Sequence, residues 1–496
     1  MAHVFIGLIL TALLFLQSEA KAQISVTGSQ LSRNGKSWIA RAIAIDGVDR
    51  FNENTVEFMK LYGADTIRIF ANQDFLDPDY VVPTGTKWFV QRDRYVEQFL
   101  TAVHLARRND LAVIIVMQAV NPTRRCQNGN NLPTDEKWPS DSSLGAGNQD
   151  CGASTSRAFH TLIEAKLKSS NYSMKNDPDV MFEIYNEPTS AEDENGHFGG
   201  CQKSLTDISN IKSCHSSSDW KLWQSSHQSV VNDLRAFGAK NVVLVGGLRW
   251  ASLFNEGYTV SDPIGKLAYA VHPYLQSNFG KPEAWKAWFG DFAALHPVIA
   301  TEFNVLPNIQ FRRCYKDMPT AASQLVEYLH HLHIGLTIWA YDFKDSMFVG
   351  APPTDPSHSL DDLTTFQGKT TTCEAGDTDA AGWLVYNYFQ GLGQSIPAPV
   401  GLATRKSENG ASLIVSWQSG GAKSLQYVIA ILPQGAPLYS PPEGAFPPKD
   451  TIYVQEKTST SFQNLLPGTY MIEVWSYDPD RPRLYSPPAI VMNIKY

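Results

Sequence analysis

The sequence has no excess of positive charge and no cysteine pattern of a metal site. Its 41 lysines and arginines are outnumbered by 49 aspartates and glutamates, which gives a net charge of −8. A nucleic-acid partner would require a basic face that neutralises phosphates, so this balance argues against one. A neutral or polymeric partner is easier to reconcile with it. The cysteines are too widely spaced for a zinc cluster, and we expect no bound metal.

Long hydrophobic runs are confined to the N-terminus. Val4–Leu16 is apolar but short for a membrane span, and small residues follow it at Ala20 and Ala22. This pattern is typical of a secretory signal, so we expect residues 1–22 to be a cleaved signal peptide and the protein to be secreted. Only His3 and the amino terminus charge the start of the run, and a short membrane anchor is the alternative. No later run is long enough to cross a membrane.

Six cysteines in a secreted chain fit three disulfide bonds. Their positions favour pairing in sequence order, because each pair then encloses a stretch rich in Gly, Ser or Asp rather than a core element. The other connectivities stay open. The favoured pairs are Cys126 with Cys151, Cys201 with Cys214, and Cys314 with Cys373.

From about residue 40 to 392, within a predicted catalytic domain at 23–392, short β-rich apolar runs alternate with amphipathic stretches of helical period such as Tyr95–Arg108. The alternation predicts βα units around a parallel sheet. Eight strands close a barrel, so we expect an α/β fold of the (β/α)8 TIM-barrel type with its active site on the loops after the strands. A doubly wound sheet would need a glycine-rich turn after its first strand, and Gly246-Gly247 follows a later one. The predicted strands are Ile43–Ile45, Thr66–Phe70, Ala112–Met117, Val180–Tyr185, Val242–Val245, Leu267–Val271, Val298–Thr301 and Leu336–Trp339.

The composition changes after Leu392. Residues 393–399 form a predicted linker, and residues 400–496 contain short alternating runs that predict a small all-β sandwich. The strand count, Trp417 and the turn at Pro467-Gly468 resemble a fibronectin type III domain. We expect Trp417 and Trp475 to be core residues rather than a sugar-binding strip.

Two glutamates each end an apolar, strand-like run. Glu187 closes the run that begins at Val180, and Glu302 closes the run that begins at Val298. These exits belong to predicted strands four and seven, which face each other across a closed barrel. Two carboxyl groups about 5 Å apart are what a retaining glycosidase uses, one to protonate the leaving oxygen and one to attack the sugar. Either glutamate alone could equally mark an ordinary strand exit.

The motif Asn186-Glu187-Pro188 after strand four, together with Glu302 after strand seven, resembles clan A glycoside hydrolases and most closely glycoside hydrolase family 5, the cellulase family. The resemblance covers the barrel and not the sandwich. It implies that Glu187 is the catalytic acid/base and Glu302 the nucleophile. It also implies an activity without a cofactor, on a polysaccharide or oligosaccharide substrate; we expect a monomer.

Other strand exits match the family in order. The resemblance implies that Arg68 lies beside the nucleophile and keeps it ionised, and that Asn186 binds the sugar 2-hydroxyl. His272 and Tyr274 are implied to orient the carboxyl groups, and Trp339 to form the floor under the sugar that is attacked. Gln118 stands where many members have histidine, which leaves the substrate subtype open. Weaker candidates for outer sugar sites are Phe70, Trp88, Trp250 and Tyr341.

Two further groups have competing interpretations. His330, His331 and His333 could suggest a metal, but they lie near a predicted helix C-terminus, where cationic side chains are favoured. Asp46 and Asp49, after strand one, could line the cleft or cap the next helix.

The sequence therefore predicts a secreted, retaining, endo-acting β-glycosidase. A β-1,4-glucan is the first expected substrate and a β-1,4-mannan the second, followed by a β-1,3-glucan or a glycolipid. The rival hypothesis is a carbohydrate-binding protein that keeps the barrel without catalysis.

Overall fold

The computed structural model describes the chain in segments. They are residues 23–82, 89–119, 126–127, 130–131, 138–143, 152–190, 215–275, 282–304, 318–343, 347–348, 360, 363–364, 381–393, 400–407, 412–418, 426–433, 451–455, 459–463, 467, 469–477 and 489–495.

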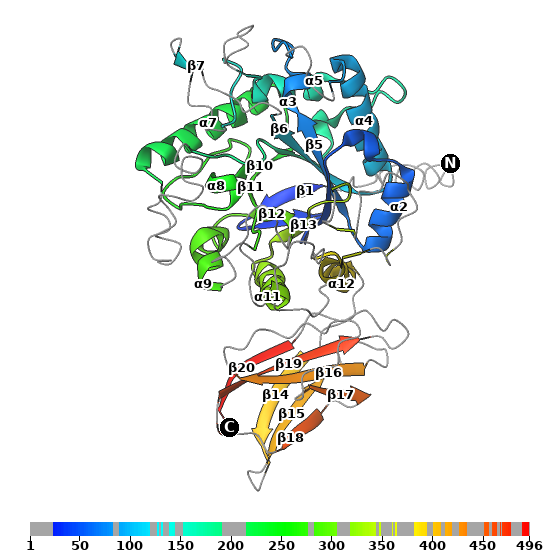
Figure 1. Ribbon diagram of the computed structural model, residues 1–496, viewed down its shortest axis with the longest axis vertical. Coiled ribbons are helices and arrows are strands. Elements are labelled where there is room, and N and C mark those ends of the chain that lie inside the picture. Colours follow the sequence, from blue (N-terminus) through cyan, green and yellow to red (C-terminus); the bar gives the residue numbers. More distant parts are fainter. Residues whose placement is uncertain are drawn as a thin grey trace, which may run out of the picture.

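Eight parallel strands form a closed barrel in which each strand pairs with the next along the chain and the last returns to the first (Figure 1). This confirms the predicted fold class. In order they are β4 (Arg41–Ile45), β5 (Thr66–Asn72), β6 (Ala112–Gln118), β9 (Val180–Glu183), β10 (Val242–Gly246), β11 (Leu267–Val271), β12 (Val298–Phe303) and β13 (Gly335–Ile338). The C-terminal ends of all eight strands open at one mouth.

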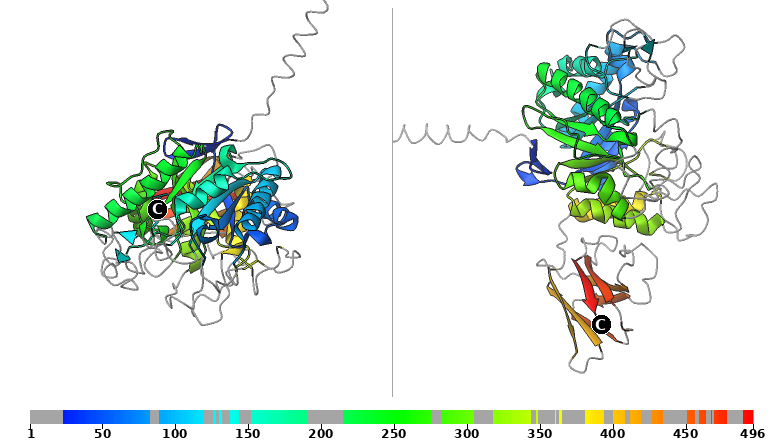
Figure 2. Two further views of the ribbon diagram at one scale, coloured as in Figure 1. Left: turned by 90° about the horizontal axis from the view of Figure 1, so that it is seen from above. Right: turned by 90° about the vertical axis from the view of Figure 1, so that its left-hand side faces the viewer.

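The barrel interior is filled in layers because alternate residues of each strand point inward. Along β6, Ala112 and Ile114 join an interior cluster, whereas Val113 and Ile115 pack against the outer helices. An antiparallel hairpin closes the end of the barrel opposite the mouth (Figure 2). It consists of β1 (Ile24–Thr27) and β2 (Gln30–Arg33), extended by β3 (Lys36–Ser37), and it contributes Ile24 and Leu31 to the interior cluster.

Helices cover the outside of the barrel (Figure 1). The main ones are α2 (Glu53–Tyr62), α4 (Arg92–Arg108), α5 (Thr155–Glu164), α7 (Ser217–Ala236), α11 (Met318–His331) and α12 (Gly382–Gly393), and shorter turns are η1 (Val48–Arg50), α3 (Gln73–Leu76), η3 (Met174–Asn176), α8 (Leu248–Ala251), α9 (Pro282–Trp285), η6 (Lys286–Gly290) and α10 (Asp291–Ala293). A hairpin of β7 (Cys126–Gln127) and β8 (Asn130–Asn131) follows β6. Local sequence sets the boundaries: the Asn52 side chain accepts from the Asn54 and Thr55 amides at the start of α2, and Gly63 ends α2 at φ 89°.

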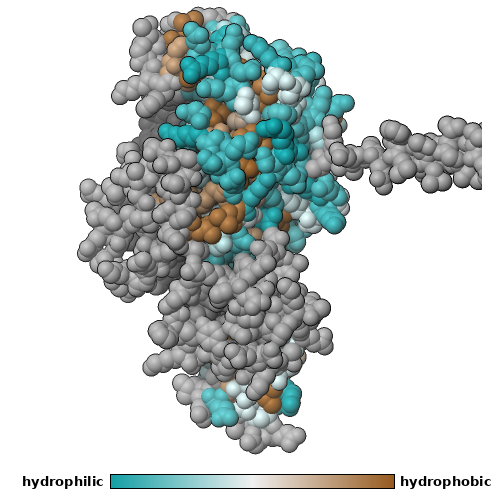
Figure 3. All heavy atoms as spheres, turned by 90° about the vertical axis from the view of Figure 1, so that its right-hand side faces the viewer, coloured by the Kyte–Doolittle hydropathy of each residue, from teal (hydrophilic) through white to brown (hydrophobic). Residues whose placement is uncertain are grey.

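The outer face that carries α2 and α4 is mostly hydrophilic in its described part, and hydrophobic atoms show in separate patches (Figure 3). Leu61, at the end of α2, is 55% exposed, whereas Val56 and Met59 of the same helix are buried. The helix therefore has one face toward the barrel and one toward solvent. Among the helices of the described segments, none combines the length and apolar character needed to cross a bilayer.

The C-terminal region forms two antiparallel sheets separate from the barrel (Figure 1). One contains β14 (Val400–Lys406), β15 (Ser412–Gln418) and β18 (Ser459–Gln463), and the other β16 (Gln426–Pro433), β17 (Thr451–Gln455), β19 (Thr469–Tyr477) and β20 (Ala489–Lys495). Trp417 is 3% exposed, in line with a core position. The Trp475 side chain lies outside what the structure describes. Strands β14 and β17 were not anticipated from the sequence.

Candidate active site

The predicted site residues gather at the mouth of the barrel. Arg68 lies within β5 and Glu302 within β12, while His272 and Trp339 directly follow β11 and β13. Glu302, His272 and Trp339 thus lie at or just after the end of an apolar strand, whereas Arg68 is inside β5 and is not the strand exit expected from the sequence. One carboxylate oxygen of Glu187 and one of Glu302 lie within 4.8 Å of each other and of a ring nitrogen of His272. The oxygens are therefore closer than the roughly 6.5–9.5 Å that separates the carboxyl groups of inverting glycosidases.

Arg68 is completely buried and connects three side chains. Its Nη1 donates to Glu302 Oε1 at 2.8 Å, and its Nη2 donates to Asn186 Oδ1 at 2.7 Å. Nε and Nη2 also donate to the two oxygens of Glu183 at 2.7 and 2.9 Å. Arg68 therefore lies beside Glu302, where the sequence places it, and it is shared with a second carboxylate that the sequence reasoning missed.

Glu302 is held by a donor on each oxygen. Tyr274 donates its hydroxyl to Oε2 at 2.9 Å, opposite the Arg68 contact on Oε1. Burial raises the pKa of Glu302 above its ordinary value, and repulsion from Glu187 adds to this, although His272 and Arg68 act in the opposite direction. Arg68 and His272 thus favour the ionised form of Glu302 and act against the effect of burial. Burial and the Glu302 charge raise the pKa of Tyr274 well above 10, so the phenol stays a donor.

His272 lies between the two carboxyl groups. Its Nδ1 is 3.1 Å from Glu187 Oε1 and 3.6 Å from Glu302 Oε2, and its Nε2 is 3.1 Å from Thr301 Oγ1. Burial lowers the pKa of His272, but the charge of Glu302 and the contacts with Glu183 and Glu187 outweigh it and raise the pKa to about 9. The ring is therefore mainly an imidazolium at neutral pH. A positive ring between them offsets the repulsion of two carboxylates that lie so close together.

Glu187 is the more accessible of the two carboxyl groups. Its side chain is 32% exposed, whereas that of Glu302 is 6% exposed. Glu187 is thus partly in contact with solvent and Glu302 is not. Such a difference in environment allows two carboxyl groups to take different roles in one reaction.

An aromatic group borders the mouth beside these charges. The rings of Phe70 and Trp339 meet edge to face with centroids 5.1 Å apart, and Phe343 lies 5.6 Å from Trp339. Phe343 is 47% exposed. Phe70 is buried, and the guanidinium carbon of Arg68 lies 4.6 Å from the centre of the Phe70 ring. An indole face at this place can pack against the C–H face of a sugar.

Other candidates have different surroundings. Gln118 ends β6 with an exposed side chain, in register with Asn72 of β5. Trp250 is partly buried in a turn of positive φ, and its amide donates to the Pro188 carbonyl at 3.1 Å. Tyr341 is 4% exposed and packs on Phe58 and Phe348, so it is a core residue rather than part of an outer sugar site.

Several predictions fall outside the described residues. Trp88 is one, and the disulfide predictions are others: only the backbone of Cys126, in β7, is described, and Cys151, Cys201, Cys214, Cys314 and Cys373 are not. Of the histidines near the end of α11, His330 Nδ1 is 3.4 Å from the Tyr388 hydroxyl and His331 Nε2 is 3.3 Å from Glu327.

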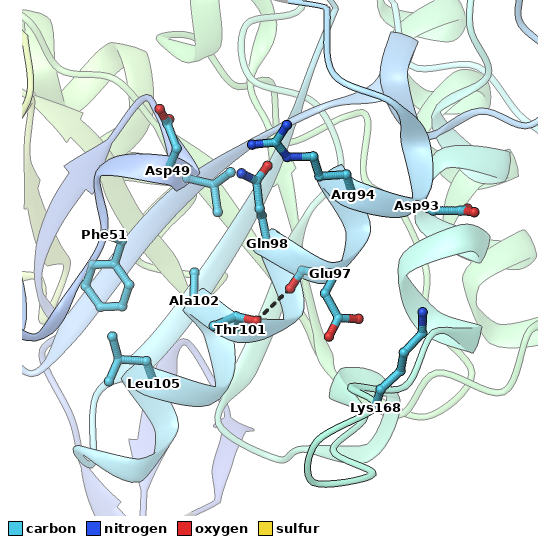
Figure 4. Close-up of a pocket in the computed structure, with 11 residues that line it drawn as sticks. Asp49, Phe51, Asp93, Arg94, Glu97, Gln98, Thr101, Ala102, Leu105 and Lys168 are labelled. Carbon is cyan, nitrogen blue, oxygen red and sulfur yellow. Dashed lines mark hydrogen bonds between the residues drawn. The ribbon is translucent and has the colours of Figure 1, made fainter.

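The structure separates the two aspartates after strand one. Asn52 caps α2, so neither aspartate does. Asp46 directly follows β4 and is exposed, and partial desolvation by its surroundings together with repulsion from Asp342 and Glu302 raises its pKa. Asp49 lines a pocket of about 500 Å³ on the outer face of α4, together with Arg94, Gln98 and Lys168 (Figure 4). None of the predicted site residues lines that pocket, so it is not the reaction site.

Glu183 and Thr301 are the main residues that the sequence reasoning missed. Both side chains are fully buried, and the Thr301 hydroxyl is 3.0 Å from Glu183 Oε1. The signal for Glu183 was present, because it is a second carboxylate in the same apolar run that ends at Glu187. The sequence pattern alone indicates only a strand residue at this position, because functional side chains are expected at strand exits.

Comparisons with known proteins identify the family of the chain. The family model described as cellulase (glycosyl hydrolase family 5) matches residues 22–345. Solved structures similar to the chain include a beta-glucanase from Saccharophagus degradans (20% identity, 66% of this chain and 88% of that chain, TM-score 0.44). Others are a GH5 cellulase from an Icelandic hot spring isolate (17%, 75% and 95%, 0.46) and the catalytic domain of a mannanase from Streptomyces sp. SirexAA-E (16%, 73% and 95%, 0.40). A comparison with curated proteins gave no match.

Proposed function

Because the chain belongs to glycosyl hydrolase family 5 and is a glycoside hydrolase, we propose that it cleaves β-linked polysaccharide by double displacement with retention of configuration. The observation that carries this proposal is the arrangement of the carboxyl groups. Glu302 is buried and held by Arg68 and Tyr274, and an oxygen of the more exposed Glu187 lies within 4.8 Å.

In the first step Glu302 attacks the anomeric carbon and forms a glycosyl ester. The bond to the leaving oxygen breaks, and that oxygen takes a proton from Glu187. Arg68 and Tyr274 hold the two oxygens of Glu302, so one lone pair is aimed while the carboxylate is kept from rotating. The amide of Asn186, fixed through its oxygen by Arg68, is left to donate to the sugar 2-hydroxyl.

In the second step a water molecule attacks the anomeric carbon and gives its proton to Glu187. The ester bond to Glu302 breaks as the bond to water forms, so Glu302 leaves as a carboxylate and the sugar is released. While Glu302 is an ester it carries no negative charge, so the repulsion on an ionised Glu187 is gone. This favours the form of Glu187 that accepts the proton.

For the substrate we propose a β-1,4-glucan first and a β-1,4-mannan second, with β-1,3-glucan or a glycolipid behind them. The cellulase family match supports the first choice, and Gln118 in place of histidine keeps the others open. We further propose a secreted monomer with a signal peptide at residues 1–22, a catalytic domain at 23–392, a linker at 393–399 and a fibronectin type III-like sandwich at 400–496. The rival on the same barrel is a carbohydrate-binding protein without catalysis.

The test combines product analysis with trapping. Defined β-1,4-gluco- and manno-oligosaccharides should be cut, and NMR of the fresh products should show the β-anomer first. A 2-deoxy-2-fluoro glycoside with a good leaving group should add one glycosyl mass to the peptide that contains Glu302. The matched control is Glu302→Gln, which should lose at least about a thousandfold in kcat while its Tm is retained. Initial release of the α-anomer, or binding without new reducing ends, would contradict the proposal.

A further inference from the structure

Glu183 sits below the catalytic carboxyl groups and is an acceptor in all its closest contacts. It receives Arg68 on both oxygens, at 2.7 and 2.9 Å, and the Thr301 hydroxyl on Oε1 at 3.0 Å. Burial alone would raise its pKa, but Arg68 and His272 lower it below the ordinary value. A buried carboxylate with these donors is ionised and has no proton to give.

An ionised Glu183 fixes the direction of the neighbouring hydrogen bonds. The Thr301 hydroxyl must donate its one proton to Glu183, so its oxygen is left to accept from His272 Nε2 at 3.1 Å. Nε2 therefore carries a hydrogen in either charge state of the ring. The other nitrogen, Nδ1, then points at both catalytic carboxyl groups, 3.1 Å from Glu187 and 3.6 Å from Glu302.

We infer that Glu183 and Thr301 are positioning residues that hold His272 so that its Nδ1–H serves whichever catalytic carboxyl group is ionised. This rests on the proposed function. In the free enzyme the negative charge is on Glu302, and in the glycosyl-enzyme it is on Glu187. A ring fixed at Nε2 can shift its Nδ1–H contact from one to the other without moving its charge.

The groups that face the ring support this assignment. Glu183 ends β9 and Glu187 lies in the loop after it, and both side chains face the ring. Thr301 and Glu302 face it from β12. The His272 amide donates to the Ala251 carbonyl at 2.8 Å. Arg68 faces Glu183 and Glu302 from β5, and the Tyr274 ring lies edge-on with its centre 6.5 Å away. Glu183, Glu187 and Glu302 thus share two positive groups, Arg68 and His272. Of these two, His272 is the one whose hydrogen bond can change from one catalytic carboxyl group to the other.

The test is Thr301→Val, which keeps the shape of the side chain and removes the hydroxyl, with Thr301→Ser as the matched control that keeps the hydroxyl. Without the acceptor at Nε2 the imidazolium is less stabilised, so the alkaline limb of the kcat/KM profile should move down by about one pH unit. At the optimum kcat should fall about tenfold with KM within about twofold, and Thr301→Ser should stay within about twofold of the wild type in both.

The measurement uses the full chain on a soluble β-glucan, with Tm recorded for each variant. A folded Thr301→Val enzyme with the wild-type kcat and pH profile would overturn the inference and leave the proposed function intact. A similar loss in Thr301→Ser would also overturn it, since the hydroxyl would not be the cause. A wild type that releases no reducing ends from any β-glycan would overturn the proposed function, and with it this inference.

Discussion

The two ends of strand β9 each carry a buried carboxylate held by arginine, and the two clusters around them differ in kind. At the mouth, Glu183 belongs to the catalytic cluster of Arg68, Glu183, Glu187, His272 and Glu302. At the opposite end, Asp179 belongs to a floor cluster of Arg33, Arg107, Asp110, Asp177 and Asp179. Asp179 receives Arg33 at 2.8 Å and Arg107 at 3.0 Å, and its side chain is as inaccessible as that of Glu183.

The difference lies in the counter-ions. In the floor cluster two arginines share Asp179, and arginine does not lose its proton in proteins. In the catalytic cluster one arginine is shared by two glutamates, and the remaining positive charge is on a histidine. The floor charges are therefore permanent and stabilise the fold, whereas the charges at the mouth can change during a reaction.

The largest effect should come from removing the arginine at each end. Arg68→Gln leaves Glu183 buried without its main partner, which should cost about 3–5 kcal/mol of stability. It should also lower kcat/KM by about a hundredfold to a thousandfold, because Glu302 loses a fixed donor. Arg33→Gln should lower stability as well but keep kcat/KM per folded molecule within about twofold.

Chemical denaturation and steady-state kinetics on the same preparations decide this prediction. Loss of activity in Arg33→Gln at full folding would break the distinction between the two clusters.

An intermediate effect should appear in the dependence of stability on pH. The folded-state pKa of His272 is raised from 6.5 to about 9, so its stabilising contribution is complete below pH 6.5 and is lost as the pH rises through 9. Tm should therefore fall between pH 6.5 and 9.5, and His272→Asn should flatten that fall. An equal slope in His272→Asn and the wild type would show that other groups cause it.

The smallest effect should come from the rim of the floor cluster. Asp110 also accepts from Arg33, at 2.9 Å, but its side chain is 82% exposed and solvent screens the pair. Asp110→Asn should change Tm by no more than about 2 °C and leave kcat/KM unchanged. Asp179→Asn is the matched buried variant, and its Tm should fall much further. Equal shifts in the two variants would mean that burial does not set the strength of this cluster.

Much of the site could be predicted from the sequence because barrel strands display their exit residues in a regular way. An apolar run precedes Glu302 and His272, and Arg68 lies inside such a run; the structure brings the three side chains together. Tyr341 shows the limit of that rule, because it follows the same run as Trp339 yet turns into the aromatic core. Glu183 shows the opposite limit, since it is the last residue of β9, four positions before the predicted exit residue Glu187, and it contacts Arg68.

By itself, the sequence determined the alternation of strands and helices, the closed barrel and the residue types at each exit, because these depend on the polarity of neighbouring residues. Tertiary structure alone decided which charges share a partner and which way the pKa values move. Arg68 meets Glu183 and Glu302 across 115 and 234 residues of chain. Burial and repulsion at such contacts arise only when the barrel closes, so the pair Glu187 and Glu302 gains its unequal character from the fold.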